Sequence, residues 1–566
     1  MKRAGVGLVA LLLPACGGDP GTRPAPGGLG EIFEMRVAGS PVLVGAPGGL
    51  DPARISVRLG LREGADARRG GVEVRFRVVR GTGRVLEAAA FTDAQGRASA
   101  AYSPATGEDS TVVRVTVPAD PQLALDVPVL TRRLWGLDPE LGSVLVLPRA
   151  SSGALLSVRP GSTVDLVPYS TSAARAPLEY SFRRGPGIGA SEASAAVPPP
   201  LRPAAAAARP PVLRPAGPAS APRHAAAPGV PSGMDVFNCR LSLHRIAPLA
   251  WLGGAVALYV DAAAPPDTTL LRELARAFDE EVAPRVVQLF GAPLDRDGNG
   301  RLLAVLSEAM PRDSGVYCQS AQYAGVEIVH GAWDPGAPAS ELVRTLAHEF
   351  QHVVHASQHY RNGGSAAPGD AVWLDEGFSN VAEWKSGYPA GVLRRTQSFF
   401  NRLNGGLPLL ADGYGSGAHG GWFLFALYLG DRFGEAVYQD LGRSGLIGRA
   451  NLERVTGVPF RDLLRDWFVT LALGDGPQPE EPAWRYGSIE LAGEAERAAA
   501  CACLPLGRLS GPPHEELEGG GELWVLRSLP TQAAHFYRVT AGERPAVVFF
   551  QAGGDPDVEL FAVPRR

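Results

Sequence analysis

Apolar and polar residues alternate along the first third of the chain. The alternation is strict over residues 72–78 and 113–117, and turn-forming residues separate the two runs. A period of two is typical of strands that bury one face. The pattern therefore predicts a β-sandwich over residues 34–131 and a small β unit over 132–184.

The pattern changes beyond residue 184. Residues 185–233 consist largely of Pro and Ala, which bury too little apolar surface to order a domain, and the prolines stiffen the segment. We therefore expect a linker there. Beyond it, strand-like runs alternate with helical patterns over 234–476, and strands return over 477–566. The sequence thus predicts an α+β domain followed by a β-rich C-terminal domain.

Helices are expected mainly in the α+β domain. Apolar residues at helical spacing predict an amphipathic helix over 268–290, capped by Asp267, which Pro284 should kink or split. Four more helices are expected from the same spacing, over about 339–359, 371–386, 420–433 and 460–473.

The N-terminus has the pattern of an export signal. Lys2 and Arg3 precede an apolar run over residues 4–13, which is too short to span a hydrocarbon layer of about 30 Å as a helix. The run ends in Leu-Pro-Ala-Cys16, which resembles the lipobox of bacterial lipoproteins. The resemblance implies that Cys16 is lipidated and anchors an exported protein to a membrane of the cell envelope, with residues 17–33 as a tether. The alternative is an ordinary secretory signal with a chance cysteine, and hence a secreted protein.

Composition and charge narrow the functional classes. The chain has 566 residues, enough for several domains of about 100–200 residues each. Its 70 Gly and 50 Pro residues suit linkers and turn-rich β-structure. The formal net charge is −4, and no cluster of Lys and Arg offers a phosphate-binding surface. Nucleic acid is therefore not expected as a partner, and no pattern predicts an oligomeric state.

Export allows disulfides among the remaining cysteines, which are Cys239, Cys318, Cys501 and Cys503. Four cysteines allow three pairings, and the sequence does not choose among them. A bond between Cys501 and Cys503 is the least favoured because the two residues lie so close along the chain.

The candidate chemistry begins with the pattern H-E-x-x-H at His348, Glu349 and His352. Residues i and i+4 lie one turn apart on the same helix face, so both imidazoles can reach one zinc ion. Glu349 is rotated off that axis, where its carboxylate can take a proton from a water molecule at the metal.

The flanking residues predict that this helix is deeply packed. Its apolar stripe consists of Leu342, Val343, Leu346, Ala347, Phe350, Val353 and Val354. The alternative is an exposed helix with chance polar residues. It is disfavoured because a buried helix rarely carries two histidines and a glutamate without using them.

A zinc site needs a third protein ligand. The pattern H-E-x-x-H-x-x-G-x-x-H fails, because this chain has His355 and Gln358 where Gly and His are required. His355 and His359 share the face of His348 but lie roughly 10 and 16 Å further along a continuous helix. They are therefore expected in supporting roles around the site or on the surface. The better candidate is Glu376, which a returning helical segment can aim at the same point.

Two motifs resemble those of a known peptidase family. HEFQH at 348–352 and WLDEGFSN at 373–380 are similar to the glutamate-zincin metallopeptidases, and most to the hyicolysin-like secreted bacterial zinc peptidases. The similarity covers residues from about 235 to 475, including LDRDGNG before a strand and YGSG before a helix. It implies a zincin-like fold whose zinc ligands are His348, His352 and Glu376, with Glu349 as general base and acid.

A second resemblance concerns the N-terminal domain. TDAQGRA at 92–98, between two strands, is similar to the turn of invasin/intimin-type bacterial Ig-like domains. That family supplies stalks and spacers at cell surfaces. The resemblance implies an Ig-like sandwich over 34–131 and nothing about chemistry.

The LDRDGNG run also resembles the start of a calcium loop, with side-chain oxygens at Asp295, Asp297 and Asn299. An EF-hand places a bidentate glutamate at position twelve, where this chain has Leu306. A bound calcium ion and a plain polar turn both remain open.

The motif does not fix the group that stabilises the oxyanion. Tyr414 and His419 lie in a Gly-rich stretch, and either can donate to a tetrahedral intermediate. A glycine-flanked tyrosine is as often a loop residue packed against a helix end. Asp375 can orient a ligand histidine or can equally be a charge on the helix surface.

The strand expected over 326–330 lies just before the helix with the histidines. In sites of this type an extended substrate can pair with such an edge strand through main-chain hydrogen bonds. This arrangement predicts a polypeptide substrate and a weak sequence preference.

Together these patterns predict an exported zinc metalloendopeptidase that hydrolyses peptide bonds of extracellular or periplasmic proteins, with zinc as its cofactor and calcium as a second candidate. A water molecule, activated by zinc and deprotonated by Glu349, would attack the peptide carbonyl. Two alternatives stay open: a surface adhesion or scaffold lipoprotein with a catalytically idle peptidase-like domain, and a zinc hydrolase of a non-peptide bond. The presence of Glu349 beside both histidines disfavours the idle domain.

Overall fold

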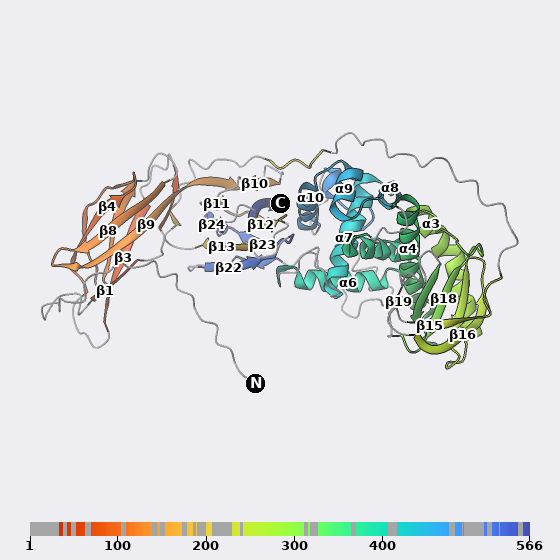
Figure 1. Ribbon diagram of the computed structural model, residues 1–566. Coiled ribbons are helices and arrows are strands. Elements are labelled where there is room, and N and C mark those ends of the chain that lie inside the picture. Colours follow the sequence, from red (N-terminus) through yellow and green to blue (C-terminus); the bar gives the residue numbers. More distant parts are fainter. Residues whose placement is uncertain are drawn as a thin grey trace. The chain divides into compact units, whose positions relative to one another are not determined.

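Strands occupy both ends of the chain and helices lie between them in the computed structural model (Figure 1). The structure describes residues 33–37, 42–46, 53–62, 69–103, 109–137, 144–147, 153–172, 178–184, 188–189, 200–205, 229–237, 242–310, 315–316, 327–363, 370–405, 416–474, 481–489, 491, 514–517, 523–530, 532–552 and 558–565. The chain divides into two units, Met1–Arg133 with Pro186–Ser194, and Leu134–Gly185 with Ala195–Arg566.

The first unit contains two β-sheets that share one apolar core. The first sheet consists of β1 (Phe33–Val37), β3 (Ala53–Leu61), β7 (Arg97–Ser103) and β5 (Arg84–Val85). The second consists of β6 (Ala89–Phe91), β4 (Glu73–Arg80), β8 (Asp109–Val117), β9 (Asp120–Leu137) up to Arg133, β2 (Val42–Ala46) and β14 (Ile188–Gly189). The strands expected over 72–78 and 113–117 are confirmed as β4 and β8, and their alternate apolar residues face the core.

The turn before β7 explains part of the TDAQGRA motif. Oδ1 of Asp93 accepts hydrogen bonds from the backbone N–H groups of Gln95 and Arg97, both at 2.8 Å. Gly96 has a φ of 79°, and a side chain there would meet the carbonyl oxygen of Leu59. Asp and Gly are therefore required at these two positions by the turn itself.

Strands from the two ends of the second unit pair with each other. The antiparallel pairings are β11 (Ala154–Val158) with β24 (Ala546–Ala552), β13 (Leu178–Arg184) with β22 (Leu523–Leu529) and β24, and β12 (Thr163–Ser170) with β23 (Tyr537–Thr540) and β25 (Val558–Arg565). Two short strands extend these sheets, β10 (Leu145–Leu147) on β25 and β21 (Glu515–Glu516) on β23. The expectation of separate β units over 132–184 and 477–566 is therefore wrong. Alternation shows which face a strand buries, but it does not show which distant strand pairs with it.

A buried charge cluster joins these two segments. The Asp165 carboxylate on β12 is fully buried; it accepts a hydrogen bond from Nε of Arg538 at 2.7 Å and another from Arg565. Nε2 of His514 lies 3.1 Å from the same carboxylate. Burial alone would raise the pKa of Asp165, but His514 and Arg538 outweigh it and hold the pKa at about 2. Asp165 is therefore ionised in the folded chain, and its negative charge is balanced by the arginines that donate hydrogen bonds to it.

We expect Asp165→Ala to lower the free energy of unfolding of this β region by about 3 kcal/mol, because the arginines lose the buried partner of their charge. Scanning calorimetry of the full chain measures the shift of the corresponding transition. The matched control is Glu179→Ala, at an exposed position of β13, which should change the transition by less than about 0.5 kcal/mol. Equal shifts in the two variants would contradict the role assigned to the cluster.

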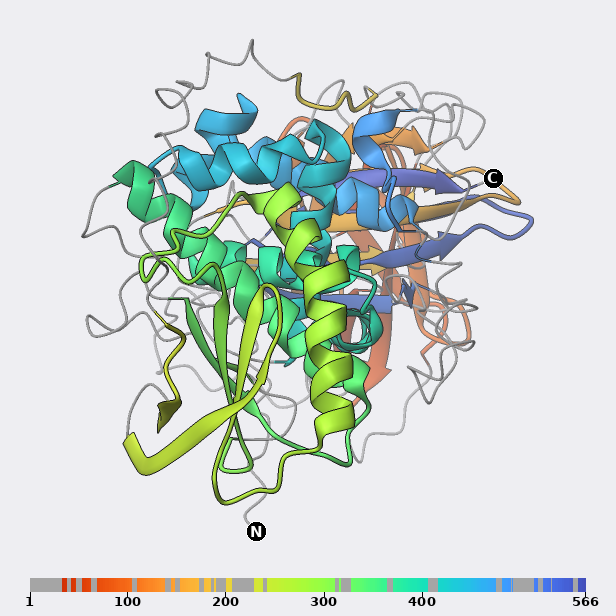
Figure 2. The same cartoon turned by 90° about the vertical axis from the view of Figure 1, so that its right-hand side faces the viewer.

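The α+β part of the second unit is built on a six-stranded sheet. In spatial order its strands are β15 (Gly233–Phe237), β16 (Ser242–Leu252), β17 (Val256–Val260), β18 (Leu302–Ser307), β20 (Ile328–Ala332) and β19 (Gly315–Val316). The three consecutive strands β17, β18 and β20 are parallel and buried along their whole length, as is typical of the centre of a parallel sheet covered by helices. Figure 2 shows the long yellow-green helix that follows β17 running beside these strands.

The edge of this sheet differs from the sequence-based expectation. The strand expected over 326–330 is β20, and its outer side is paired antiparallel with β19 through His330 and Gly331. On this side of the described sheet the edge strand is therefore β19 and not β20. A strand of two residues leaves no apolar alternation, so the sequence pattern did not indicate it.

The helix expected over 268–290 is present in three pieces. These are α2 (Thr268–Ala277), a π-helical turn (Phe278–Val282) and α3 (Ala283–Phe290). Asp267 caps α2 by accepting hydrogen bonds from the backbone N–H groups of Thr269 and Leu270, at 2.9 and 3.0 Å. Pro284 lies in the first turn of α3, directly after the π-helical turn. The predicted cap and the predicted split are both confirmed.

The candidate site lies on some of the remaining helices. The four predicted ones are confirmed as α4 (Ala339–Gly363), α5 (Val372–Lys385), α7 (Ser416–Phe433) and α10 (Phe460–Leu473). The described residues form three more α-helices that were not predicted, α6 (Ala390–Arg402), α8 (Ala436–Arg443) and α9 (Gly448–Thr456). α5 packs against both α4 and α7, so the chain returns to α4 after the histidines. Within the described ranges, no helix is long and apolar enough to cross a membrane.

Candidate metal centre

α4 holds His348, Glu349 and His352 on a helix buried in the largest apolar core. The seven residues of the expected stripe are all at most 7% exposed, as predicted: Leu342, Val343, Leu346, Ala347, Phe350, Val353 and Val354. Phe350 also packs edge-on against Phe278 of the π-helical turn, with 5.2 Å between the ring centroids. The helix is therefore fixed by its apolar face, and its histidines turn toward α5.

Glu376 on α5 meets the two histidines. Its Oε2 lies 3.2 Å from Nε2 of His348, and its Oε1 lies 3.9 Å from Nε2 of His352. Gly377 lets α5 approach α7, because a side chain there would stand 2.8 Å from the carbonyl oxygen of Trp422. The two helices thus bring Glu376 to His348 and His352, although Glu376 lies 24 residues after the nearer histidine in the sequence.

Each of the two histidines also contacts a second carboxylate through its other ring nitrogen. Nδ1 of His348 lies 2.7 Å from Oε1 of Glu383, and Nδ1 of His352 lies 3.2 Å from Oδ2 of Asp375. Such contacts fix the orientation of a metal-binding imidazole and raise its basicity. Sequence reasoning weighed Asp375 for this position but missed Glu383. The available signal was its spacing, seven residues or two helical turns after Glu376 on the same face of α5.

The carboxylates shift the pKa of both histidines. Burial disfavours the charged form of His348, but the adjacent carboxylates of Glu376 and Glu383 outweigh burial and raise the pKa of His348 to about 9. Burial acts on His352 in the same way, and Asp375 with Glu376 raises its pKa to about 10. Burial would raise the pKa of Glu376, yet the two histidines hold it well below its ordinary value. The cluster therefore stabilises positive charge between the imidazoles and the carboxylate.

This arrangement fits a zinc ion. The three ligand atoms of His348, His352 and Glu376 all lie within 4.8 Å of one another. Oε2 of Glu376 is buried and has no partner in hydrogen-bond geometry, although an imidazole nitrogen stands 3.2 Å away. Two imidazoles and one carboxylate are also the ligand set of many catalytic zinc sites, which keep a fourth position for water or substrate.

We expect Glu383→Gln to weaken zinc binding by about 10–100-fold, because it removes the charged partner that orients His348. Competition with a fluorescent zinc chelator measures the dissociation constant. Glu273→Gln, at an exposed position of α2, is the matched control and should bind zinc like the unmodified chain. Unchanged zinc affinity in the Glu383 variant would show that its contact with His348 does not support the metal.

Of the other residues proposed for catalysis, two are described and one is not. Glu349 is 4% exposed and follows His348 directly on α4. Nδ1 of His419, in the first turn of α7, lies 3.4 Å from Oε2 of Glu376, and burial lowers its pKa to about 4. Its ring also packs against Trp422, with 4.7 Å between centroids. Tyr414 lies outside the described residues.

His355 and His359 are close together but away from the first cluster. Each is 2% exposed, so the surface alternative for these residues is wrong. Their ring nitrogens face Asp370, a residue that the sequence analysis did not single out.

The structure brings two of the three candidate calcium ligands together and adds a carboxylate that the sequence analysis did not name. Carboxylate oxygens of Asp295, Asp297 and Glu327 lie within 4.8 Å of one another. Asn299 instead donates from Nδ2 to Asp297 at 2.6 Å and accepts with Oδ1 from the backbone of Arg301 at 2.7 Å. Glu327 comes from the residue before β20, 32 positions after Asp295, so no loop motif could have indicated it.

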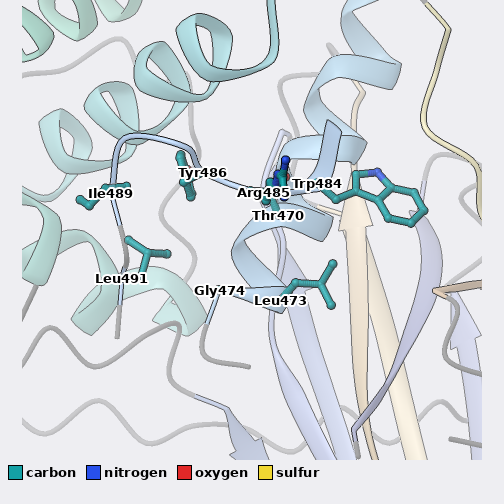
Figure 3. A pocket seen from close by; sticks show the side chains of 8 residues that line it. All are labelled: Thr470, Leu473, Gly474, Trp484, Arg485, Tyr486, Ile489 and Leu491. Atoms are coloured by element: carbon teal, nitrogen blue, oxygen red, sulfur yellow. The ribbon is translucent and has the colours of Figure 1, made fainter. Parts of the chain in front are cut away.

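A small pocket lies at the C-terminal end of α10 (Figure 3). Its eight lining residues are Thr470, Leu473, Gly474, Trp484, Arg485, Tyr486, Ile489 and Leu491. Only one of them is charged, and none belongs to the clusters described above. The pocket therefore adds nothing to the candidate chemistry.

The five cysteines lie outside the described residues. This applies to Cys16, expected to carry the lipid, and to the four residues among which export allows disulfides: Cys239, Cys318, Cys501 and Cys503. Both expectations stay predictions from the sequence.

Comparisons with known proteins identify no family. No family model and no curated protein matches the chain. Solved structures that match include S-layer protein SbsC domains 4 and 5, with 17% identity over 18% of this chain and 52% of that chain and a TM-score of 0.13. They also include the D0-D1 domain of intimin, with 14% identity over 27% of this chain and 71% of that one and a TM-score of 0.15. The secreted serine protease VesC from Vibrio cholerae matches with 10% identity over 27% of this chain and 40% of that one, also at 0.15.

This chain thus spans about half the length of the first of these structures. At these TM-scores the likenesses carry no argument about fold or function.

Proposed function

We propose that the protein is a zinc-dependent metalloendopeptidase with a zincin-like catalytic domain. The observation that carries the proposal is the convergence of His348, His352 and Glu376 from two helices, with their ligand atoms within 4.8 Å of one another. Glu349 stands beside them on the same turn of α4 and is buried. Two histidines, a glutamate ligand and an adjacent carboxylate are the parts needed for metal-assisted hydrolysis.

The roles of the side chains follow from their chemistry. Zinc, when bound, supplies a Lewis acid that polarises the substrate carbonyl and makes water easier to deprotonate. Glu349 takes a proton from the attacking water and later gives it to the leaving amine. His419, neutral near pH 7 because its pKa is about 4, donates a hydrogen bond to the negative oxygen of the tetrahedral intermediate. Tyr414 is the second candidate for that role.

An extended polypeptide is the proposed substrate. β19 lies at the edge of the six-stranded sheet, runs antiparallel to β20 and contacts α4. A peptide can add to such an edge through main-chain hydrogen bonds, which gives weak sequence preference. The N-terminal export signal leads us to propose extracellular or periplasmic proteins as substrates, with the enzyme anchored through Cys16 or secreted.

Casein cleavage by the full chain tests the proposal. We expect cleavage to stop when 1,10-phenanthroline removes zinc and to return when zinc is restored. Cleavage that persists in zinc-free protein contradicts the proposal. No cleavage by a chain that carries stoichiometric zinc favours the idle scaffold or a non-peptide substrate.

Calcium is a secondary proposal for the loop at 295–299. Glu327 is 3% exposed, and its Oε2 is buried with no hydrogen-bond partner. Burial raises the pKa of Glu327, and Asp297 and Asp295 raise it further, so a cation would relieve the repulsion among the three carboxylates. Calcium binding to the full chain, followed by calorimetry, tests this assignment.

A further inference from the structure

A second cluster of metal-binding side chains lies further along α4. His355 and His359, again four residues apart, bring their Nε2 atoms to 3.1 Å from each other. Oδ2 of Asp370, two residues before α5, lies 3.5 Å from Nε2 of His355 and 3.7 Å from Nε2 of His359. The three side chains thus form a compact triangle of ligand atoms.

Two of the three edges of this triangle suit a cation better than hydrogen bonds, and the third, between the two imidazoles, is also of hydrogen-bond length. The two contacts with Asp370 are longer than ordinary N–H···O bonds, which reach to about 3.2 Å. A tetrahedral zinc ion with ligands at about 2.0–2.1 Å holds them about 3.3–3.4 Å apart. The observed edges of 3.1, 3.5 and 3.7 Å lie on both sides of that value. Small movements of the side chains would therefore bring all three ligand atoms to zinc-binding distance.

The carboxylate of Asp370 is held in place by its surroundings. Its Oδ1 accepts hydrogen bonds from the backbone N–H groups of Ala371, at 2.7 Å, and of Gly448 at the start of α9. Nδ2 of Asn451 lies 3.4 Å from Oδ2. With Oδ1 bonded to the backbone, Oδ2 is the oxygen that faces the imidazoles, as is usual for a metal-binding carboxylate with outer partners.

The cluster is closed to solvent. The side chains of His355, His359 and Asp370 are 3%, 2% and 0% exposed. Phe378 of α5 covers one imidazole, with 5.5 Å between its ring and that of His355. A substrate cannot reach such a position, so an ion bound there would serve the structure rather than catalysis. Imidazole and carboxylate ligands suit zinc among the common divalent ions.

We propose that His355, His359 and Asp370 bind a second, structural zinc ion. The ion would hold α4 against the segment that begins α5. Asp370 would extend this link to the beginning of α9, because it accepts a hydrogen bond from Gly448. It would thereby fix the angle at which α5 brings Glu376 to His348. The assignment is independent of the peptidase proposal, because an idle domain would bind the same ion.

Zinc content of the full chain tests the assignment. The protein is loaded with zinc chloride, dialysed into metal-free buffer and measured by inductively coupled plasma mass spectrometry. We expect two zinc ions per chain in the unmodified protein and one in Asp370→Asn, which keeps the shape of the side chain. Asp334→Asn is the matched control, because its Oδ1 also accepts a backbone hydrogen bond, and it should keep two.

A second variant makes the result independent of whether Asp370→Asn folds. His348→Gln combined with His352→Gln removes the first site and should keep one zinc ion. In that background, chelation should lower the thermal unfolding temperature, and adding Asp370→Asn should abolish both the remaining zinc and this sensitivity. The proposal is overturned if the double variant binds no zinc, or if Asp370→Asn folds and still binds two ions.

Discussion

Glu349→Gln should stop peptide hydrolysis while zinc stays bound. We expect kcat/KM for casein to fall by about 10²–10⁴-fold, because an amide neither accepts the proton of the attacking water nor returns it to the leaving amine. Glu349 is not among the three side chains whose ligand atoms cluster at the first site. The variant should therefore carry as much zinc as the unmodified chain, and activities should be compared at matched zinc content.

The control for this variant is another Glu→Gln change, Glu308→Gln, at an exposed position after β18. It should retain full activity and full zinc content. Loss of zinc from Glu349→Gln would make this residue a ligand rather than a base. Equal cleavage by Glu349→Gln and the unmodified chain would mean that the activity does not arise at this site.

Sequence periodicity predicted the parts of the site that depend on one helix. His348 and His352 are one turn apart, and the apolar stripe of α4 predicted which face is buried. The position of Glu376 depends on how the chain folds between α4 and α5, which spacing does not show. Glu376 was predicted as a ligand because its motif resembles that of a peptidase family. Glu383 and Asp370 were missed because their contacts depend on how α5 packs against α4. Spacing alone gives the face of a helix but not the neighbour that the face meets.

The β-structure shows the same division between local and distant information. The β-structure of residues 132–184 was predicted from the sequence, yet the partners of its strands are about 400 residues away, as in the pairing of Thr163 on β12 with Arg565. Strand pairing over such a separation is decided by the complementary faces of the assembled sheets, which no local pattern contains. Asp165 illustrates the consequence, because its role depends on arginines at the other end of the chain.

Glu376→Gln should remove the zinc that Glu349 needs. We expect zinc affinity to fall by more than the roughly 100-fold that the loss of an outer partner can cost, because a neutral amide replaces a charged ligand. Casein cleavage should disappear at zinc concentrations that saturate the unmodified chain. Glu383→Gln is the internal comparison: it should lose affinity in the same direction but to a smaller extent, since Glu383 contacts only the imidazole of His348 within the proposed ligand set.

A second measurement separates a ligand from a residue that merely contacts His348. In the zinc-free chain, burial lowers the pKa of His348, while Glu376 and Glu383 raise it to about 9. Histidine NMR titration of zinc-free Glu376→Gln should therefore give a lower pKa for His348, because one of the two stabilising carboxylates is gone. If the pKa falls but zinc affinity is unchanged, Glu376 is only a hydrogen-bond partner and the third ligand lies elsewhere. If the pKa of His348 and the zinc affinity both fall, the carboxylate of Glu376 is a ligand in the metal site itself.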